Sequence, residues 1–539
     1  MTTTRSSAIV RKARLCLAFM LLAATGPTVL QAQPSAATVD PLVRSDNIQL
    51  PTLGDGSEMS SSAERRLGDR IAREIYRDPD YVDDPVLADY VQGIWQPLLA
   101  ASRLRGDLSS EIYERFAWEI LLVRDRTVNA FALPGGYMGL HLGLIAVVDS
   151  RDELASVLAH ELSHITQRHI ARMMTKQGQM TPWMIGAMIL GALAASRSPD
   201  AGSALIVGGQ AVAAQNQLNF SRDMEREADR VGFGVMTQAG FKPQGFVTMF
   251  DKLQQASRLN DNGAYPYLRS HPLTTERIAD MQARQPLHPS GQSTAVPTSE
   301  HAMIAARARV LSNPGVDSLR AIAAEAQGRA LEALPPARRA GALYGAALAA
   351  IRLREFAEAR DDLGRLSEWV RADARAARLS QLLEIELALA AGSLERAAAL
   401  LERAVPGGTA ALTLRRPELF LQAQLAGQAR DVRQAAQAAQ SLQVWVLAHP
   451  RDAQAWQMLS SVYAVQGQAL RAIRADAESQ VARLDYAAAL ERYKAAQDLM
   501  RHSAQTDAGK ATLDYIESSI IDTRKRQVES LLKEQSLDR

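Results

Sequence analysis

His160 and His164 stand four residues apart, and Glu161 directly follows the first histidine. Residues i and i+4 lie on one face of an α-helix, so both imidazole rings can reach one metal ion. Glu161 then lies beside the metal, where its carboxylate can take a proton from a metal-bound water. This pattern predicts metal-assisted hydrolysis, whereas the alternative is a solvent-facing helix that carries two unrelated histidines.

The residues around the two histidines predict the helix that this chemistry needs. Ser150 and Glu153 have the spacing of a capping box, in which each side chain bonds to a free backbone N–H at the helix start. Apolar residues then recur at helical spacing, at Leu154, Val157, Leu158, Leu162 and Ile165.

A second charged segment offers the remaining ligand, because a catalytic zinc site usually has three protein ligands and one open position. Glu225 and Asp229 are four residues apart and share one helix face, while Glu227 faces away from both. We expect Glu225 to be the third ligand and Asp229 to orient a ligand imidazole from outside the coordination shell. The alternative is a solvated helix face, since acidic and basic residues alternate here.

The two motifs together resemble the gluzincin metallopeptidases. The likeness extends to the segment 129–136 before the first motif, and to His271-Pro272-Leu273 with Arg277 after the second. The sequence most resembles the branch that joins this catalytic domain to C-terminal tetratricopeptide repeats, the periplasmic β-barrel assembly-enhancing proteases. The protease motifs are highly specific, and the repeats are less so. The resemblance covers nearly the whole chain after its first 32 residues. It implies one Zn²⁺ per subunit, held by His160, His164 and Glu225, with Glu161 as general base.

The same resemblance implies a biological role and a set of partners. The expected function is a periplasmic zinc-dependent endopeptidase that degrades misfolded or stalled outer-membrane β-barrel proteins. Its repeats would engage the outer-membrane assembly machinery and assist assembly, and the protein would be associated with the outer membrane. The alternative is a periplasmic chaperone or scaffold with latent peptidase activity.

Three further features have both a functional and a structural interpretation. The segment of Asn129, Ala130, Phe131 and Ala132 is expected to be an exposed edge strand that pairs with extended substrates, or else a tight turn. His271 precedes a proline, which favours extended backbone, and is either a surface residue or a fourth zinc ligand that latches the site shut. Arg277 would assist the oxyanion or pair with a carboxylate.

The elements between residues 61 and 284 predict an α+β zinc metallopeptidase domain, mostly helical with a small sheet. Residues 63–101 show a helical pattern with interruptions near 78–79 and 84–85. Strands are expected at 118–123, 131–133 and 137–144, packed on the metal helix. Two apolar runs within 182–214 are expected to be buried core helices, a lid over the site, or a contact with a membrane surface or unfolded clients.

The proline- and glycine-rich segment 285–300 predicts a linker, and the alanine- and leucine-rich segment 301–520 predicts an all-α tetratricopeptide-repeat solenoid. Repeat spacing is clearest at Trp456, Leu459, Tyr463 and Ala472. Such units stack into a curved array with a concave binding face, although a helical array without a partner is the alternative. Residues 521–539 are expected to form a C-terminal helical tail.

Residues 1–32 have the features of a secretory signal, namely basic residues, an apolar run from Leu15 to Ala24, and Leu30-Gln31-Ala32 as a cleavage site. Residues 33–60 are rich in Pro, Ser, Thr and Gly and predict a flexible lead-in. Removal of the signal takes away four basic residues and no acidic ones, so the net charge of +2 becomes −2 (2 − 4). This balance gives no support for nucleic-acid binding.

Composition sets the remaining limits. With 539 residues, the chain can form two or more domains, and 47% hydrophobic with 22% charged residues is typical of globular proteins. Cys16 is the only cysteine, and it lies in the predicted signal. The mature protein therefore can form no internal disulfide, and export to an oxidising compartment would not alter its covalent structure.

Overall fold

The computed structural model describes residues 59–177, 222–258, 264–284, 297–404, 414–504 and 511–537. These residues all belong to one compact unit that begins at Asp55. The predicted signal at 1–32, nearly all of the lead-in at 33–60, the apolar insert at 182–214 and most of the linker at 285–300 lie outside the described ranges.

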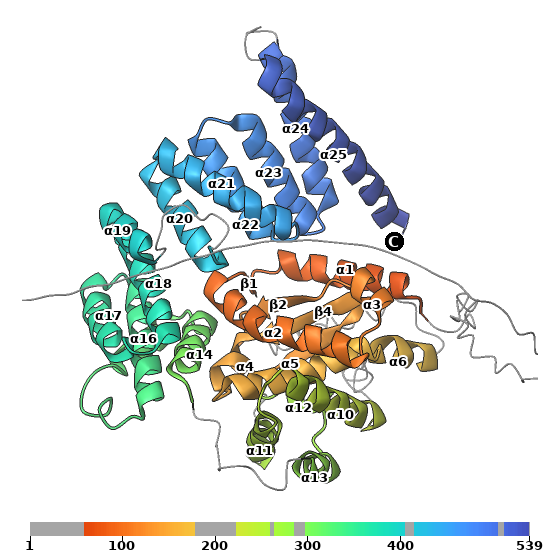
Figure 1. Cartoon of the computed structure of the whole chain (residues 1–539), viewed down its shortest axis with the longest axis vertical. Coiled ribbons are helices and arrows are strands. Elements are labelled where there is room, and N and C mark those ends of the chain that lie inside the picture. The colour runs from red at the N-terminus through yellow and green to blue at the C-terminus, as the bar shows by residue number, and fades with distance from the viewer. Residues whose placement is uncertain are drawn as a thin grey trace, which may run out of the picture. The chain divides into compact units, whose positions relative to one another are not determined.

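The N-terminal half of the described chain combines helices with one small sheet, as the α+β prediction requires (Figure 1). The first helix ends at Arg77, and Asp84 caps the next helix with Pro85 in its first turn, so the expected interruptions are confirmed. The elements are α1 (Ser61–Arg77), β1 (Tyr81–Val82), α2 (Pro85–Arg105), α3 (Ser110–Arg115), β2 (Glu119–Val123), β3 (Ala130–Leu133), the 3₁₀ turn η1 (Pro134–Gly136), β4 (Tyr137–His141), α4 (Leu142–Val147), α5 (Arg151–Thr166), α6 (His169–Gln177), α10 (Arg222–Gln238), α11 (Gln244–Arg258), α12 (Tyr267–Ser270) and α13 (Thr275–Ala283).

The four strands lie in the order β1-β2-β4-β3. Strand β2 pairs in parallel with β4, whereas β1 and β3 run antiparallel to their single partners. Strand β3 is therefore an edge strand among the described residues. The third predicted strand was expected to reach residue 144, but it ends at His141 and residues 142–147 form α4. A short apolar run has no periodicity that separates a buried strand from a buried helix, which explains this error.

Helix α5 lies at the centre of this half, between the sheet and the helices α10 and α11 (Figure 1). Its residues from Glu153 to Ile165 are all buried. Helix α10 approaches it closely at Gly232, where a Cβ would lie 3.0 Å from the Ala159 carbonyl oxygen. Because this contact is adjacent to His160, it sets the distance between the two helices that carry the predicted metal ligands.

The described residues from 297 onward form helices only, which agrees with the predicted all-α region. Helix α25 runs without a break across residue 520, where the C-terminal tail was expected to begin. No helix within the described ranges is long and apolar enough to cross a bilayer. The elements are α14 (Ser299–Ser312), α15 (Val316–Ala324), α16 (Pro336–Leu353), α17 (Phe356–Val370), α18 (Ala374–Ala390), α19 (Leu394–Ala404), α20 (Arg416–Ala429), α21 (Val432–Ala448), α22 (Ala453–Val465), α23 (Ala469–Ala482), α24 (Tyr486–Ala504) and α25 (Ala511–Leu537).

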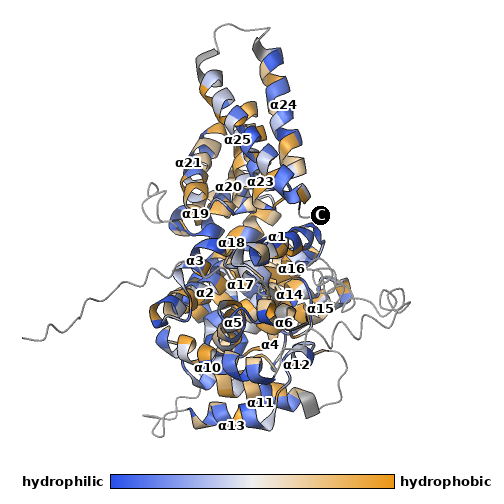
Figure 2. Cartoon of the chain, turned by 90° about the vertical axis from the view of Figure 1, so that its right-hand side faces the viewer, coloured by the Kyte–Doolittle hydropathy of each residue, from blue (hydrophilic) through white to orange (hydrophobic). Residues whose placement is uncertain are grey.

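Most of these helices mix hydrophobic and hydrophilic residues along their length, as Figure 2 shows for α24. Helices of this kind bury one apolar face and leave a polar face outside. In the pair α22 and α23, the predicted repeat residues Leu459, Tyr463 and Ala472 are all buried in one apolar cluster. The expected repeat spacing therefore coincides with the packing of this helix pair.

Helix α14 shares its apolar core with the N-terminal half, although it follows the predicted linker. The buried ring of His301 contacts the Tyr90 hydroxyl at 2.7 Å through Nδ1 and the Val148 carbonyl oxygen at 2.9 Å through Nε2. Arg307 donates to both carboxylate oxygens of Asp84, at 2.8 and 2.7 Å. Bidentate pairs of this kind fix orientation as well as distance.

Helix α1 packs directly on the turn between β3 and β4, and Gly68 makes this contact. A Cβ at Gly68 would lie 2.0 Å from the Pro134 carbonyl oxygen.

We therefore expect Gly68→Ala to lower stability by roughly 1–3 kcal/mol, as overpacking does, measured by thermal unfolding of the full chain. Gly364 in α17 is the matched control, because a Cβ there meets nothing within 4 Å. Gly364→Ala should stabilise by up to about 1 kcal/mol, and equal unfolding temperatures for both variants would contradict the packing argument.

Candidate metal centre

One of the two bonds of the predicted capping box is present, and the second goes to the residue before the cap. Ser150 Oγ accepts a hydrogen bond from the Glu153 backbone N–H at 3.1 Å, and Glu153 Oε2 accepts one from the Asp149 N–H at 2.8 Å. The helix then continues through both histidines, whose Nε2 atoms lie 3.0 Å apart. The four-residue spacing therefore brings the two imidazoles to one point.

Four side chains from three parts of the chain place potential ligand atoms around this point. Within the described residues, His160, His164, Glu225 and His271 each offer one nitrogen or oxygen atom, and these atoms lie within 4.8 Å of one another. All four side chains are at most 2% exposed. Three imidazole nitrogens and one carboxylate oxygen match the ligand types that Zn²⁺ prefers, so the donor set fits the metal that the sequence predicts.

Asp229 lies behind this group and supports it. Its Oδ1 atom lies 2.9 Å from His160 Nδ1, the nitrogen that faces away from the other ligands. Arg277 donates to both Asp229 oxygens, at 2.6 and 2.8 Å, and its Nη1 atom lies 2.8 Å from Glu225 Oε2. Arg277 also donates to the Pro272 carbonyl oxygen at 2.8 Å. Of its two expected roles, these contacts match pairing with carboxylates.

Glu161 connects the ligand group to the sheet. Its Oε2 atom accepts a hydrogen bond from the Ala132 backbone N–H at 2.9 Å, and its Oε1 atom lies 3.4 Å from His271 Nε2. Asn129 lies just before β3, where its carbonyl oxygen accepts from the His141 N–H at 3.1 Å. Antiparallel pairing alternates along a strand, so Asn129 and Phe131 bond to β4 while Ala130 and Ala132 direct their N–H groups away from β4. The N–H of Ala132 is the one that donates to Glu161.

Burial and neighbouring charges shift the pKa values of these groups in opposite directions. Burial raises the pKa of Glu161, although His271 and His160 act against it. Burial acts to lower the pKa of His160, but its contacts with Asp229 and Glu225 outweigh burial and raise the value to about 10. His271 and His160 hold the pKa of Glu225 well below its usual range in spite of burial. Glu161 is thus the carboxylate of the centre that binds a proton most readily.

His169 is a further member of this network that the sequence interpretation missed. Its Nδ1 atom lies 2.8 Å from His164 Nδ1, and its Nε2 atom lies 3.1 Å from Glu227 Oε2. Glu227 faces away from the ligand group, as predicted, and it pairs with Arg172 at 2.9 Å. His169 follows His164 by five residues, and this spacing does not place two side chains on one face of a helix. The sequence therefore gave no signal for this contact.

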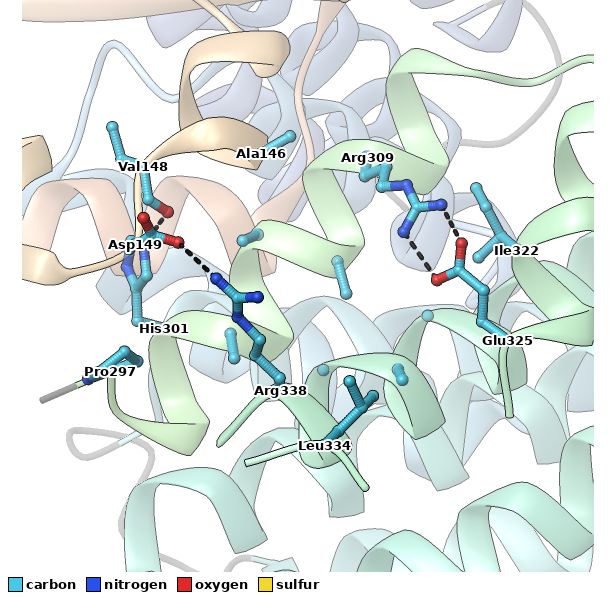
Figure 3. Close-up of a pocket in the computed structure, with 16 residues that line it drawn as sticks. Ala146, Val148, Asp149, Pro297, His301, Arg309, Ile322, Glu325, Leu334 and Arg338 are labelled. Carbon is cyan, nitrogen blue, oxygen red and sulfur yellow. Dashed lines mark hydrogen bonds and ion pairs between the residues drawn. The ribbon is translucent and has the colours of Figure 1, made fainter. Parts of the chain in front are cut away.

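A separate pocket of about 290 Å³ lies between the end of α4 and the helices α14, α15 and α16 (Figure 3). Seven of its sixteen lining residues are alanine or glycine, and two ion pairs are among the others. Arg309 pairs with Glu325, and Arg338 lies 3.8 Å from Asp149. None of the four ligand residues lines this pocket, so it is distinct from the metal centre.

Comparison with known proteins agrees with this geometry. The profile of peptidase family M48 matches residues 101–285. A beta-barrel assembly-enhancing protease from Yersinia pestis is 30% identical over 444 residues, which cover 80% of this chain and 83% of that protein. The chain belongs to peptidase family M48. It is therefore a metalloendopeptidase, and the resemblance found in the sequence is confirmed.

Two other relatives with the assembly-enhancing name align over a shorter region. The one from Vibrio cholerae is 35% identical over 261 residues, covering 47% of this chain and 51% of the relative. The one from Escherichia coli K12 is 33% identical over 241 residues, covering 44% of this chain and 47% of the relative. The chain thus matches about half the length of these two relatives.

The buried pairing of Arg277 generates a stability prediction for this M48 centre. Arg277→Met would remove the guanidinium from the buried carboxylates of Asp229 and Glu225 and leave His160 as their remaining cationic neighbour, so we expect a loss of about 3–5 kcal/mol. Arg284→Met is the control, because Arg284 forms a partly exposed pair with Asp280 and should cost under about 1 kcal/mol. Chemical denaturation of the metal-free full chain measures both, and a similar small loss in both variants would show that Arg277 is not needed for charge balance.

Proposed function

We propose that the chain is an exported zinc endopeptidase of the M48 family that acts on unfolded outer-membrane proteins. The observation that carries the proposal is the buried group of three imidazoles and one carboxylate, with Glu161 between that group and an edge strand. Such a group supplies metal ligands, a proton acceptor and a binding edge for a polypeptide in one place.

The residues of the centre have separate roles. His160, His164 and Glu225 would hold one Zn²⁺, which supplies an activated water and polarises the scissile carbonyl. Glu161 takes the proton from the attacking water and passes it to the leaving amine. Asp229 orients His160 through its 2.9 Å contact, and Arg277 balances the charges of Asp229 and Glu225.

The edge strand β3 gives the binding mode. Ala130 and Ala132 direct backbone groups away from β4, so an extended substrate can add as a further strand. Main-chain hydrogen bonds tolerate many side-chain sequences, which suits the removal of misfolded proteins. The Phe131 ring packs on Gly139 of β4, where an added Cβ would lie 2.1 Å from the ring.

His271 is proposed as a latch on this centre. Its Nδ1 atom lies 2.9 Å from Glu225 Oε1, and its ring stacks on Tyr267 with 4.6 Å between centroids. The backbone N–H of Tyr267 donates to the Val128 carbonyl oxygen at 3.2 Å, on the open edge that continues into β3. A substrate strand that extends to Val128 would displace this segment and draw His271 away from the ligand group.

The relatives extend the proposal to a cellular role. Their shared name concerns β-barrel assembly, and we propose that this chain likewise acts in the periplasm on outer-membrane β-barrel proteins. Residues 1–32 would serve as the export signal. The helices of 301–520 would form tetratricopeptide-like repeats that dock the assembly machinery, with 61–284 as the catalytic domain.

Separate roles for ligand and base predict different phenotypes. Glu161→Gln should retain zinc and lose about 10²–10⁴-fold in hydrolysis of an unfolded protein such as casein. Glu225→Ala should lose zinc, because it removes a ligand. Metal analysis of the purified full chain, together with the hydrolysis rate, distinguishes them. Full zinc occupancy in Glu225→Ala would move the third ligand elsewhere, and unchanged hydrolysis by Glu161→Gln would show that Glu161 is not the base. Absence of hydrolysis by the zinc-loaded wild type would favour a chaperone or scaffold instead.

The latch predicts a gain of activity. His271→Ala should hydrolyse unfolded proteins faster than the wild type, because the residue no longer competes for the metal's open position, and zinc should remain bound. His449, an exposed histidine on the surface of the helical region, provides the control substitution His449→Ala. Lower or unchanged activity in His271→Ala with normal zinc would argue against a latch.

A further inference from the structure

His169 reaches the metal centre by a turn that the chain holds in an uncommon conformation. Helix α5 ends at Thr166, and Arg168 adopts a φ of 52°, in the left-handed region that residues other than glycine rarely occupy. The Arg168 Nε atom donates to Glu64 Oε2 of α1 at 2.9 Å. This contact holds the turn, and the turn directs the first residue of α6 back toward His164.

The contacts of His164 determine where its proton lies. Its Nε2 atom faces the other ligand atoms, 3.0 Å from His160 Nε2 and 3.5 Å from Glu225 Oε1. A ring nitrogen that gives its lone pair to a metal carries no proton, so the proton of His164 is on Nδ1. That nitrogen lies 2.8 Å from His169 Nδ1, which must therefore accept the hydrogen bond.

The same reasoning determines the proton of His169. Because its Nδ1 atom accepts from His164, a neutral His169 carries its proton on Nε2. Nε2 lies 3.1 Å from Glu227 Oε2, and the carboxylate accepts this bond. Arg172 lies 2.9 Å from the same oxygen and keeps Glu227 ionised and in place. Hydrogen bonds thus run in one direction, from the ligand His164 through His169 to Glu227.

We propose that His169 is a positioning residue that holds His164 in the tautomer and ring orientation required for metal binding. The inference rests on the metal site proposed above. Each helix ligand then has its own acceptor at Nδ1, Asp229 for His160 and His169 for His164. A neutral acceptor serves His164 without adding another buried negative charge to a centre that already contains Glu161, Glu225 and Asp229. Outer partners of this kind contribute substantially to metal affinity.

The test measures zinc affinity, not hydrolysis. The metal-free full chain is titrated with Zn²⁺ against a chromophoric chelator, and thermal unfolding of the metal-free protein is recorded in parallel. His169→Phe keeps a planar ring but cannot accept the bond, so Zn²⁺ should bind roughly 10–100-fold more weakly. His169→Gln restores an acceptor and a donor, and most of the affinity should return. A role confined to packing would change the unfolding temperature and leave zinc affinity unaltered.

Two further variants complete the test. His301→Phe removes a buried histidine outside the centre whose two ring nitrogens both have hydrogen-bond partners. Zinc affinity should stay at the wild-type value in this variant. Glu227 is partly exposed, so Glu227→Leu tests the outer end of the chain of hydrogen bonds without enlarging the core, and it should weaken zinc binding. Wild-type zinc affinity in His169→Phe would overturn the role of His169 but not the proposed metal site. If His169→Phe does not fold, wild-type zinc affinity in Glu227→Leu would have the same consequence. Failure of the wild type to bind Zn²⁺ would overturn the proposed metal site as well.

Discussion

The buried pairing of Arg277 with Asp229 and Glu225 is the interaction on which the rest of the centre depends. Burial of two carboxylates is costly unless a cation accompanies them. Arg277 supplies that cation from α13 and also donates to the Pro272 carbonyl oxygen, so it ties the segment after His271 to α10. With both carboxylates held, Asp229 can orient one ligand histidine while Glu225 faces the others. Helices α5 and α10 can therefore present a complete donor set before any metal binds.

The sheet couples this donor set to a polypeptide. Because β3 is an edge strand and Ala132 donates to Glu161, the strand that would bind substrate also touches the predicted base. The segment around Tyr267 occupies the same edge near Val128 and continues to His271. If His271 acts as the proposed latch, occupation of the edge by substrate and closure of the centre by His271 exclude each other.

Much of this arrangement could be predicted from local sequence. The capping box, the four-residue spacing of His160 and His164, and the spacing of Glu225 and Asp229 each depend on helix periodicity, which the sequence shows directly. The role of His169 could not be predicted, because it depends on the left-handed Arg168 and on its contact with a helix about a hundred residues away. The prediction that the strand extends to residue 144 was wrong because a short, fully buried apolar run has no periodicity that distinguishes a strand from a helix.

Binding of zinc by the ligand atoms gathered between α5, α10 and α12 can be tested directly. X-ray diffraction from crystals of the zinc-loaded full chain, with data on both sides of the zinc absorption edge, locates the metal without reference to activity. We expect one anomalous peak, about 2.0–2.2 Å from the Nε2 atoms of His160 and His164 and from a Glu225 oxygen. A peak at any other position, or a peak at this position without Glu225 among its ligands, would contradict it.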